Sequence, residues 1–560
     1  MQSGLNAIYY TTTTNKYPAP VSSSHEPGGR LGLSFGNCGR LAWLLCLAVL
    51  AGCTTSNSVR PDSAASAQAY RPSATSAAYE NQRRALVAAD SARAFNAAIV
   101  LSAEEQQANR KLIFLRQQLL SHYDSTHYFP PGRNFYRSRN HMYATKLFQL
   151  LRTMPKGGIH HLHPNAGGSS WWIVQRALRE PQCYVYWQPD NQQYVKGQIF
   201  FFRPREAPAG FYPAKALNDT VRNFPQKLHD LLTFSDRVSH DSVDVWREFE
   251  RCFQRLGGFT SYQPVFKDLY AATFDSLAAD GVQHVELRTS LNGSLYDLQH
   301  PASSFPADSI IRYFQHAAQR TRARRDPAFT FKLIYTNTRF RSLDIIKADL
   351  KKAFELRKRH PNTVVAYDLV AHEDAGHTTD FFREAWFTRD SLKRIYGIDM
   401  PLCLHDGESA WQHTNNLYDA ALLNSTRIGH GFNLSFFPAA EDLVRQNDIC
   451  IEVSPLSNQI LDYIGDLRMH PAHAWIKHGI QISISPDDPE IFDYVGVTPD
   501  YWSILLAWEL DLRDLKKLAL NGIEYSYLST AEKKLALAAW QQKWAVFVAK
   551  INQEVALRNK

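Results

Sequence analysis

Residues 158–163 read GIHHLH, a short apolar and β-prone run that ends in two histidines one residue apart. Seven similar runs follow along the chain, and each ends in polar or ionisable residues. They are HVELR (284–288), FKLIYTNTR (331–339), VVAYDLVAHE (364–373), LCLHDGE (402–408), RIGHG (427–431), ICIEVSP (449–455) and QISISPDD (481–488). Most intervals between the runs can hold one helix, which predicts alternating β and α elements and a parallel sheet.

Eight is the number of strands in a closed (β/α)8 barrel of the TIM type, in which the chemistry lies at the carboxyl ends of the strands. In this sequence the His, Asp and Glu residues fall at those ends. The alternative is an open doubly wound sheet, which usually has a Gly-rich first turn that this sequence lacks. We therefore expect an α/β protein with a (β/α)8 barrel over residues 136–550.

Two additions to the barrel are predicted. The interval between His163 and His284 is much longer than the others, so a segment is inserted after the first strand. Within it, CYVYWQPDNQQYVKGQIFFF (183–202) has two aromatic runs around a turn, which predicts a hairpin in an inserted module of residues 180–240. Ahead of the barrel, residues 79–135 favour helix, and Ser102 followed by Glu104 and Glu105 is typical of a helix start.

The beginning of the chain resembles an export signal. Residues 41–52, LAWLLCLAVLAG, are uncharged and mostly apolar. As a helix they cover only about 18 Å, well short of the roughly 30 Å hydrocarbon core of a bilayer. This predicts a signal peptide over residues 1–52 rather than a membrane span. Residues 1–39 are long for such a leader, so we expect translation to start further along the chain.

The four residues Leu50-Ala51-Gly52-Cys53 resemble the lipobox of bacterial lipoproteins, in which the Cys is lipidated and becomes the mature N-terminus. We expect a lipid on Cys53 and a location in a bacterial cell envelope, with Thr54 favouring the outer membrane. The alternative is a periplasmic or secreted protein that is cleaved near the same place. The Ser-, Ala- and Thr-rich residues 53–78 then form a flexible tether.

Composition excludes several function classes. The chain has 560 residues, of which 44% are hydrophobic and 21% charged, as is typical of a globular protein. Its net charge of +8 never gathers into a basic run, so we expect no nucleic-acid partner. The seven Cys contain no C-x-x-C pair, which excludes a Cys-rich zinc site. Any metal must be held by His and carboxylate.

His161 and His163 fall on one face of the first predicted strand because strand side chains alternate, and their imidazoles can converge on one ion. Alone, such a pair is a weak signal in a chain with 21 His. The signal is strengthened by His405, His430 and the pair 487–488 at the ends of later runs. Two His from one strand, one His from another and one carboxylate suit Zn²⁺.

A candidate acid follows one of these ligands. Glu408 comes three residues after His405, in a turn where Gly407 frees the backbone. A carboxyl group in this position could act as a general acid or base on a substrate beside the metal.

In their order along the chain, these motifs resemble those of the adenosine deaminases. The resemblance covers residues 140–545. It rests on the runs MPKGGIHHLH (154–163), HVELR (284–288), DLVAHED (368–374), HDGE (405–408), RIGHG (427–431), IEVSPLSN (451–458) and SPDDP (485–489). The long first interval, the MPKGG opening and the helical segment ahead of it resemble one branch, the secreted adenosine deaminase-related growth factors.

The resemblance implies a role for each site residue. Glu408 would protonate the purine N1, His430 would orient the attacking water and help to remove its proton, and Asp488 would hydrogen-bond N7. The implied reaction converts adenosine and water to inosine and ammonia, with one Zn²⁺ per chain. The implied zinc ligands are His161, His163, His405 and Asp487, and Asp487 is thereby also a catalytic residue.

Four positions bear on the substrate. Ala371 stands where family members usually carry Gly against the purine, so its N–H is kept while a methyl group crowds the ring. Pro164 stands where the related branch often has Asp on the ribose side, and Asp406 adds a carboxylate near the metal. The preferred nucleoside therefore stays open between adenosine, 2′-deoxyadenosine and related adenine nucleosides. Trp246 would close the pocket by analogy with the related branch, although its spacing also fits plain core packing.

Two other functions stay open at this point. A metal-dependent amidohydrolase or another aminopurine deaminase could use the same barrel, but an amidohydrolase needs no acid for N1. A surface binding protein with a vestigial barrel is the second alternative, and the intact metal and proton-transfer positions speak against it. The branch resemblance also implies a homodimer through the N-terminal helices.

Overall fold

All eight apolar runs form strands in the structure, a computed structural model that describes residues 75–235, 244–292, 295–299 and 305–555. Within these residues they pair in parallel as two four-stranded sheets, in the orders β1-β5-β6-β7 and β11-β10-β9-β8. Their bounds are β1 (Gly157–Leu162), β5 (Val282–Thr289), β6 (Thr330–Thr338), β7 (Val364–Val370), β8 (His405–Asp406), β9 (Arg427–His430), β10 (Cys450–Val453) and β11 (Ile482–Ile484).

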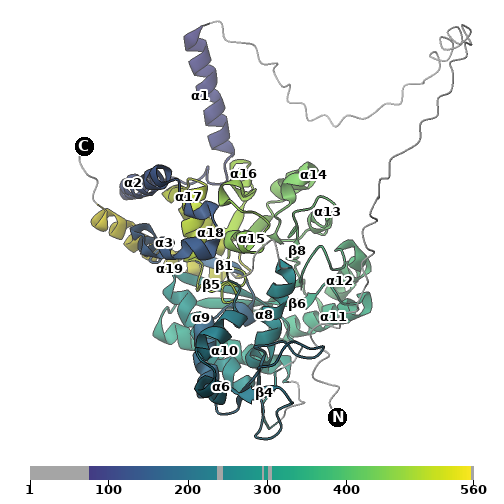
Figure 1. Ribbon diagram of the computed structural model, residues 1–560. Helices are drawn as coiled ribbons and strands as arrows, with labels where there is room; N and C mark the ends of the chain where they lie inside the picture. The colour runs from purple at the N-terminus through teal and green to yellow at the C-terminus, as the bar shows by residue number, and fades with distance from the viewer. Residues whose placement is uncertain (1–74, 236–243, 293–294, 300–304, 556–560) are drawn as a thin grey trace, which may run out of the picture. The chain divides into compact units, whose positions relative to one another are not determined.

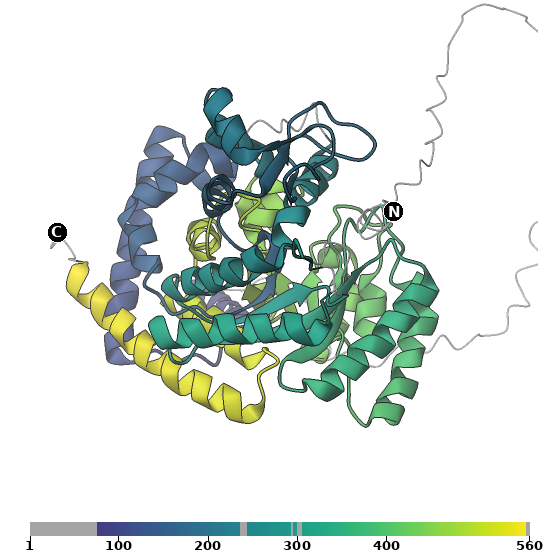
Figure 2. The ribbon, with the colours of Figure 1, turned by 90° about the horizontal axis from the view of Figure 1, so that it is seen from below.

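Two seams join the sheets into a closed barrel, seen from two directions in Figures 1 and 2. At one seam Tyr367 donates its N–H to the carbonyl of Pro401 (2.9 Å) and accepts from the N–H of Cys403 (3.1 Å). At the other, the Asp487 N–H donates to the carbonyl of His161 (3.3 Å), and the His163 N–H donates to that of Asp487 (3.2 Å). The predicted (β/α)8 barrel is confirmed, and its second seam runs between predicted metal ligands.

Helices cover the outside of the barrel. Strands β1, β5, β9, β10 and β11 are buried throughout, because one face meets the helices and the other fills the barrel. The helices that follow or separate the strands are α9 (Gln263–Ala279), α10 (Ala307–Arg324), α11 (Leu343–Arg359), α12 (Arg383–Tyr396), α13 (Leu417–Leu422), α14 (Pro438–Gln446), α15 (Pro455–Ile460), α16 (Ala472–Lys477), α17 (Thr498–Ala507) and α18 (Leu512–Glu524). Short 3-10 turns cover Pro130–Gly132, Pro164–Ala166, Asp380–Phe382, Leu434–Phe436 and Leu467–Met469.

The segment ahead of the barrel is helical, as predicted. It contains α1 (Ser76–Arg93), α2 (Ala103–Thr126), α3 (Phe135–Ala144) and α4 (Lys146–Leu151). The helix start at Ser102 is confirmed, since Ser102 and Glu105 cap one another's backbone N–H. Helix α2 packs along the last helix, α19 (Thr530–Glu554). There the indole N–H of Trp544 donates to Glu105 (2.7 Å). The homodimer through these helices stays a prediction.

The described chain divides into two units. Residues from 87 onward form one compact unit, and the part of α1 before residue 87 belongs to the other. The predicted signal peptide, Cys53 and the tether up to residue 74 lie outside the described residues. Among the residues that are described, no helix has both the length and the apolar character that a membrane span needs.

The insertion after β1 is a small module of mixed structure. Helix α5 (Ser170–Arg179) leads into an antiparallel sheet in the order β3-β2-β4, formed by β2 (Cys183–Tyr186), β3 (Ile199–Phe201) and β4 (Phe211–Pro213). The predicted hairpin is confirmed as β2 and β3, which pair from Cys183 opposite Phe201. Helices α6 (Ala214–Thr220), α7 (Phe224–Leu232) and α8 (Val245–Thr260) lead back to the barrel (Figure 1).

The carboxylate of Asp493 accepts hydrogen bonds from three separate segments of the chain. Its carboxylate accepts from Arg139 of α3 (2.6 Å) and from Nε2 of His229 in α7 (3.0 Å). The hydroxyl of Ser170, at the start of α5, donates to the same carboxylate (3.2 Å). Asp493 follows shortly after Asp488 in the chain, so the N-terminal segment and the inserted module both hold the loop that carries the last predicted site residues.

Candidate metal and catalytic site

The carboxyl ends of three strands bring the predicted metal ligands together. Nε2 of His405, from β8, lies 2.9 Å from Nε2 of His161 and 3.3 Å from Nε2 of His163, which both come from the end of β1. Oδ1 of Asp487, which follows β11, lies 3.4 Å from each of the β1 Nε2 atoms. All four predicted ligands therefore meet at one point in the barrel mouth.

These separations fit one small cation. Nitrogen and oxygen ligands held at 2.0–2.1 Å around a tetrahedral Zn²⁺ lie about 3.3 Å apart. Nδ1 of His161 faces Glu452 (3.1 Å) and Nδ1 of His405 faces Asp368 (2.8 Å), so both protons belong on Nδ1. The two Nε2 lone pairs then point at each other, an arrangement that a cation between them stabilises. Burial lowers the pKa of both imidazoles, which keeps them neutral for metal binding.

Arg288 connects the two carboxylates behind these imidazoles. Its guanidinium donates through Nε to Asp368 (3.0 Å) and through Nη2 to Glu452, and all three side chains are fully buried. Arg427 pairs with the other oxygen of Glu452 (2.6 Å) and with Glu286. Sequence reasoning missed Asp368 and Glu452 as partners of the ligands, and Arg427 as a partner of Glu452. The available signal was a charged residue inside an otherwise apolar strand run.

Glu408 and His430 lie beside the metal ligands. Oε2 of Glu408 lies 3.7 Å from Nε2 of His430, and both side chains are buried. The His430 ring centroid is 4.6 Å from that of His161. Burial, reinforced by the carboxylates of Asp487 and Glu373, raises the pKa of Glu408 well above its usual value. The raised pKa favours the protonated form of Glu408, as its predicted role as an acid requires.

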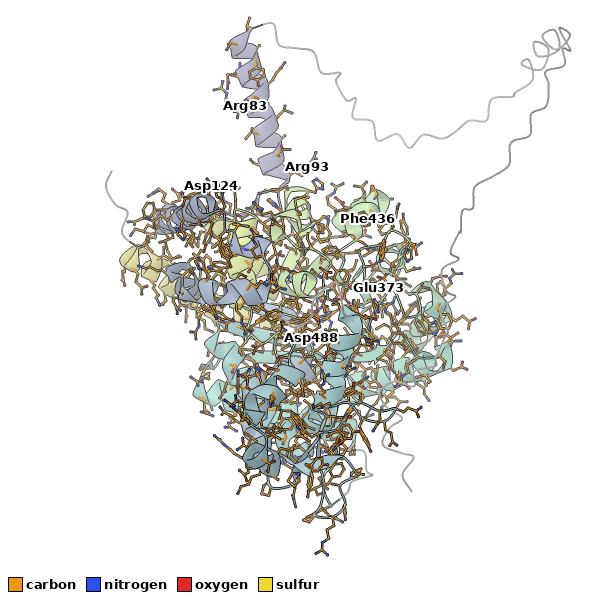
Figure 3. All side chains as sticks on the ribbon, viewed as in Figure 1. Arg83, Arg93, Asp124, Glu373, Phe436 and Asp488 are labelled. Atoms are coloured by element: carbon orange, nitrogen blue, oxygen red, sulfur yellow. The ribbon has the colours of Figure 1, made fainter. Side chains whose placement is uncertain are left out.

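Asp488 is a second buried carboxyl group in the mouth. Asp488 and Glu373, both labelled in Figure 3, are each 3% exposed. Burial and the adjacent Asp487 raise the pKa of Asp488 well above its usual value. Its Oδ1 atom has no hydrogen-bond partner among the described residues, so this atom is available to a bound molecule.

Trp246 and Ala371 lie at the rim. Ala371 follows β7 with φ +86°, a backbone conformation that residues other than glycine rarely adopt. The next residue, His372, stacks on Trp246 with ring centroids 4.4 Å apart. Trp246 is half-buried at the start of α8 and donates to the hydroxyl of Tyr463 (3.1 Å), which donates to the carbonyl of Glu408 (3.0 Å). Trp246 is thus connected to the predicted acid.

Asp406 and Pro164 lie apart from the ligand atoms. The Asp406 carboxylate accepts from the hydroxyl of Thr379 (2.5 Å) and lies 3.4 Å from Nη2 of Arg339. Its partners are therefore Thr379 and Arg339, and Asp406 is not among the candidate ligand groups of the described residues. Pro164 is buried and begins the 3-10 turn directly after His163.

A (β/α)8 barrel whose strand ends gather three histidines and an aspartate defines a metal-dependent hydrolase. Within that class, the chain belongs to the adenosine deaminase family. The family model described as adenosine deaminase matches residues 217–541, and the model described as adenosine/AMP deaminase N-terminal matches residues 43–151. The enzyme is accordingly a hydrolytic deaminase.

Individual relatives agree with this assignment. Adenosine deaminase 2 of Sus scrofa is 34% identical over 474 residues, which are 81% of this chain and 91% of the relative. Adenosine deaminase 2 of Homo sapiens is 31% identical over 466 residues, covering 81% and 90%. Among solved structures, the adenine deaminase of Arthrobacter aurescens covers 70% of this chain and 99% of its own, with a TM-score of 0.50 at 16% identity. An amidohydrolase of Burkhoderia ambifaria with bound Zn covers 72% and 94%, with a TM-score of 0.51 at 15% identity. The two structures share the fold.

The partners of the ligands make a prediction about metal affinity. Asp368→Asn is expected to weaken zinc binding by about 10–100-fold, because the amide holds the Nδ1 proton of His405 poorly and leaves Arg288 with one charge partner fewer. Competition with a chelating dye measures the affinity. Asp308→Asn is the matched control, since Asp308 also pairs with an Arg and a His (Arg359 and His360) but on the outer helix α10. Equal zinc affinity in the two variants would contradict the prediction.

Proposed function

We propose that this protein is a zinc-dependent deaminase of adenine nucleosides, which converts adenosine and water to inosine and ammonia. One observation carries the proposal: a cation-sized cluster of ligands shares the barrel mouth with two buried carboxyl groups, Glu408 and Asp488, whose pKa values are raised by burial. Membership of the adenosine deaminase family supports the substrate class.

His161, His163, His405 and Asp487 would hold the zinc ion. A bound zinc ion polarises water and lowers its pKa towards neutrality. The choice of zinc is supported by the three-nitrogen, one-oxygen ligand set, by the ligand separations and by the zinc in the amidohydrolase of the same fold.

The protons of the reaction would be handled by three side chains: Glu408 at N1, His430 at the attacking water and Asp488 at N7. The protonated Glu408 donates to N1 of the purine, which makes C6 electrophilic. Burial lowers the pKa of His430, so its imidazole is neutral. A neutral imidazole can accept a hydrogen bond from the attacking water, and His430 would orient this water and help to remove its proton. N7 is an acceptor, and the protonated Asp488 can donate to it. Two donors, one for each of these ring nitrogens, would suit an aminopurine deaminase, whereas an amidohydrolase needs neither.

On the substrate side, the N–H of Ala371 would meet the purine, and Trp246 would close the pocket. The stack of Trp246 on His372, directly after Ala371, supports this arrangement because it joins α8 to the end of β7. Pro164, which brings no carboxylate to the ribose side, leaves the preferred sugar to be measured.

Glu408→Gln is expected to lower turnover by about 10²–10⁴-fold, because the amide cannot give N1 a proton. The loss of ultraviolet absorbance of adenosine measures this, beside 2′-deoxyadenosine, 5′-methylthioadenosine and adenine. Glu384→Gln, at an exposed ion pair with Lys347, is the control and should keep full activity. No turnover of any of the four compounds by zinc-loaded wild type would instead favour the amidohydrolase.

Ala371→Gly tests the crowded purine position. Removing the methyl group is expected to raise kcat/KM by about fivefold, equivalent to relief of roughly 1 kcal/mol of contact or backbone strain. The free energy of unfolding should change by less than about 1 kcal/mol, because relief at φ +86° is offset by the larger chain entropy of glycine. Kinetics on adenosine and urea unfolding provide the two readouts. An unchanged kcat/KM would place the methyl group away from the substrate.

We also propose that a lipid on Cys53 holds the enzyme in a bacterial cell envelope, where it acts on nucleosides outside the cytoplasm. The lipobox-like residues 50–53 and the Ser-, Ala- and Thr-rich stretch after them support this. Cys53→Ser is expected to move the enzyme from the membrane fraction to the soluble fraction of expressing cells, with kcat unchanged. Equal amounts of wild type and variant in the membrane fraction would disprove the anchor.

A further inference from the structure

Glu408 sits in a turn whose backbone is held by a carboxylate from the neighbouring strand end. Glu373 lies just after β7, and it points its side chain at the turn after β8. Oε1 of Glu373 accepts the N–H of Gly407 (3.0 Å), and Oε2 accepts the N–H of Glu408 (2.6 Å). The two oxygens of one carboxylate therefore bind two consecutive peptide N–H groups, one of which belongs to the predicted acid.

A third donor keeps the Glu373 carboxylate in place. The side-chain amide of Asn416 donates to Oε1 of Glu373 (2.7 Å), and the amide oxygen accepts the N–H of Thr379 (2.9 Å). Glu373 is 3% exposed, so water does not compete for these hydrogen bonds. The carboxylate has one orientation that satisfies all three donors.

The turn itself leaves little freedom. Gly407 has φ +85°, and a Cβ atom there would lie 2.9 Å from both Oδ1 of Asn433 and a side-chain carbon of Leu417. In the next peptide group, the carbonyl of Glu408 accepts from the hydroxyl of Tyr463 (3.0 Å). Both the N–H and the carbonyl of Glu408 are thus bound, and only its side chain is left to reach the substrate.

We propose that Glu373 is a positioning residue for Glu408. By accepting two consecutive N–H groups, it sets the direction in which the Glu408 side chain leaves the turn, and so the place of its carboxyl group beside His430. The inference rests on the proposed function, in which Glu408 is the proton donor to the purine.

This role requires a carboxylate. A glutamine at position 373 offers one acceptor oxygen, while its NH₂ group is a donor and would oppose one of the two peptide N–H groups. One buried N–H then loses its partner, and the turn must shift to find another. An aspartate is one methylene shorter and cannot place both oxygens at the two N–H groups from the same backbone position.

The test measures adenosine deamination by the zinc-loaded, full chain carrying Glu373→Gln. We expect kcat to fall by at least tenfold, with KM within about threefold of wild type and zinc content unchanged, because the acid is displaced while the binding surface and the ligands stay. A general loss of folding would move kcat, KM and zinc content together.

Asp280→Asn is the matched control. Asp280 is also a buried carboxylate that accepts two consecutive N–H groups, those of Val497 (2.8 Å) and Thr498 (3.1 Å). It contacts Lys156 at the amino end of β1, the end of the barrel opposite to the site. We expect Asp280→Asn to lower stability and leave kcat within twofold.

A crystal structure of Glu373→Gln provides a readout that does not depend on turnover. The expected result is a moved Gly407–Glu408 peptide and a longer distance from Glu408 to His430. An unmoved Glu408 with unchanged kcat overturns the inference.

If the wild type deaminates no adenine nucleoside, the proposed function fails, and the position of Glu408 in the variant structure alone decides the inference. If Glu373→Gln does not fold, Asn416→Ala replaces it, with a smaller fall in kcat expected, and an unchanged kcat there overturns the inference.

Discussion

The buried charge of Arg288 organises the candidate site. A guanidinium in a barrel core is stable only if carboxylates surround it, and removing one partner of such a pair costs about 3–5 kcal/mol. Arg288 meets Asp368 and Glu452, and each of these carboxylates faces the Nδ1 atom of a predicted metal ligand, His405 or His161. The packing of one arginine therefore orients two imidazoles that come from different strands. The pairing of charges inside the barrel and the shape of the metal site are one arrangement, so neither can change alone.

Three residues of the mouth depart from ordinary backbone geometry. None of the three is a glycine. Ala371 directly follows β7 (φ +86°), His430 ends β9 (φ +64°), and Asp487 lies three residues after β11 (φ +64°). Such conformations cost on the order of 1–3 kcal/mol each and persist only where the surroundings enforce them. Here the closed ring of strands and the buried ion pairs provide that enforcement. The sharp bends turn the side chains of His430 and Asp487 into the mouth instead of along the strands.

Much of this architecture can be predicted from the order of residues alone. The eight apolar runs identify the strands because parallel strands are buried on both faces, and polar residues where the runs end mark the mouth. The His161 and His163 pair and the capping of α2 are likewise local patterns. The direction of Asp406 could not be predicted because β8 is only two residues long, and its carboxylate is placed by Thr379 and Arg339, which come from other loops. The contacts of three carboxylates could not be predicted in the same way. Asp368 and Glu452 bind side chains that are distant in the chain, and Glu373 binds backbone N–H groups. Neither kind of partner can be identified from the sequence.

The hydrogen bonds of Asp493 have a consequence for how such an enzyme can change over time. Arg139 in the N-terminal segment and His229 in the inserted module both bind this one carboxylate, a few residues beyond Asp488. A descendant that loses either segment leaves a half-buried negative charge without one of its partners, beside the loop of the predicted site. A simpler barrel that acquires only one of the segments does not supply all the partners of this charge. The two accessory segments are therefore expected to be inherited as a pair, and an engineer who trims this enzyme to its barrel must first rebuild the loop that Asp493 anchors.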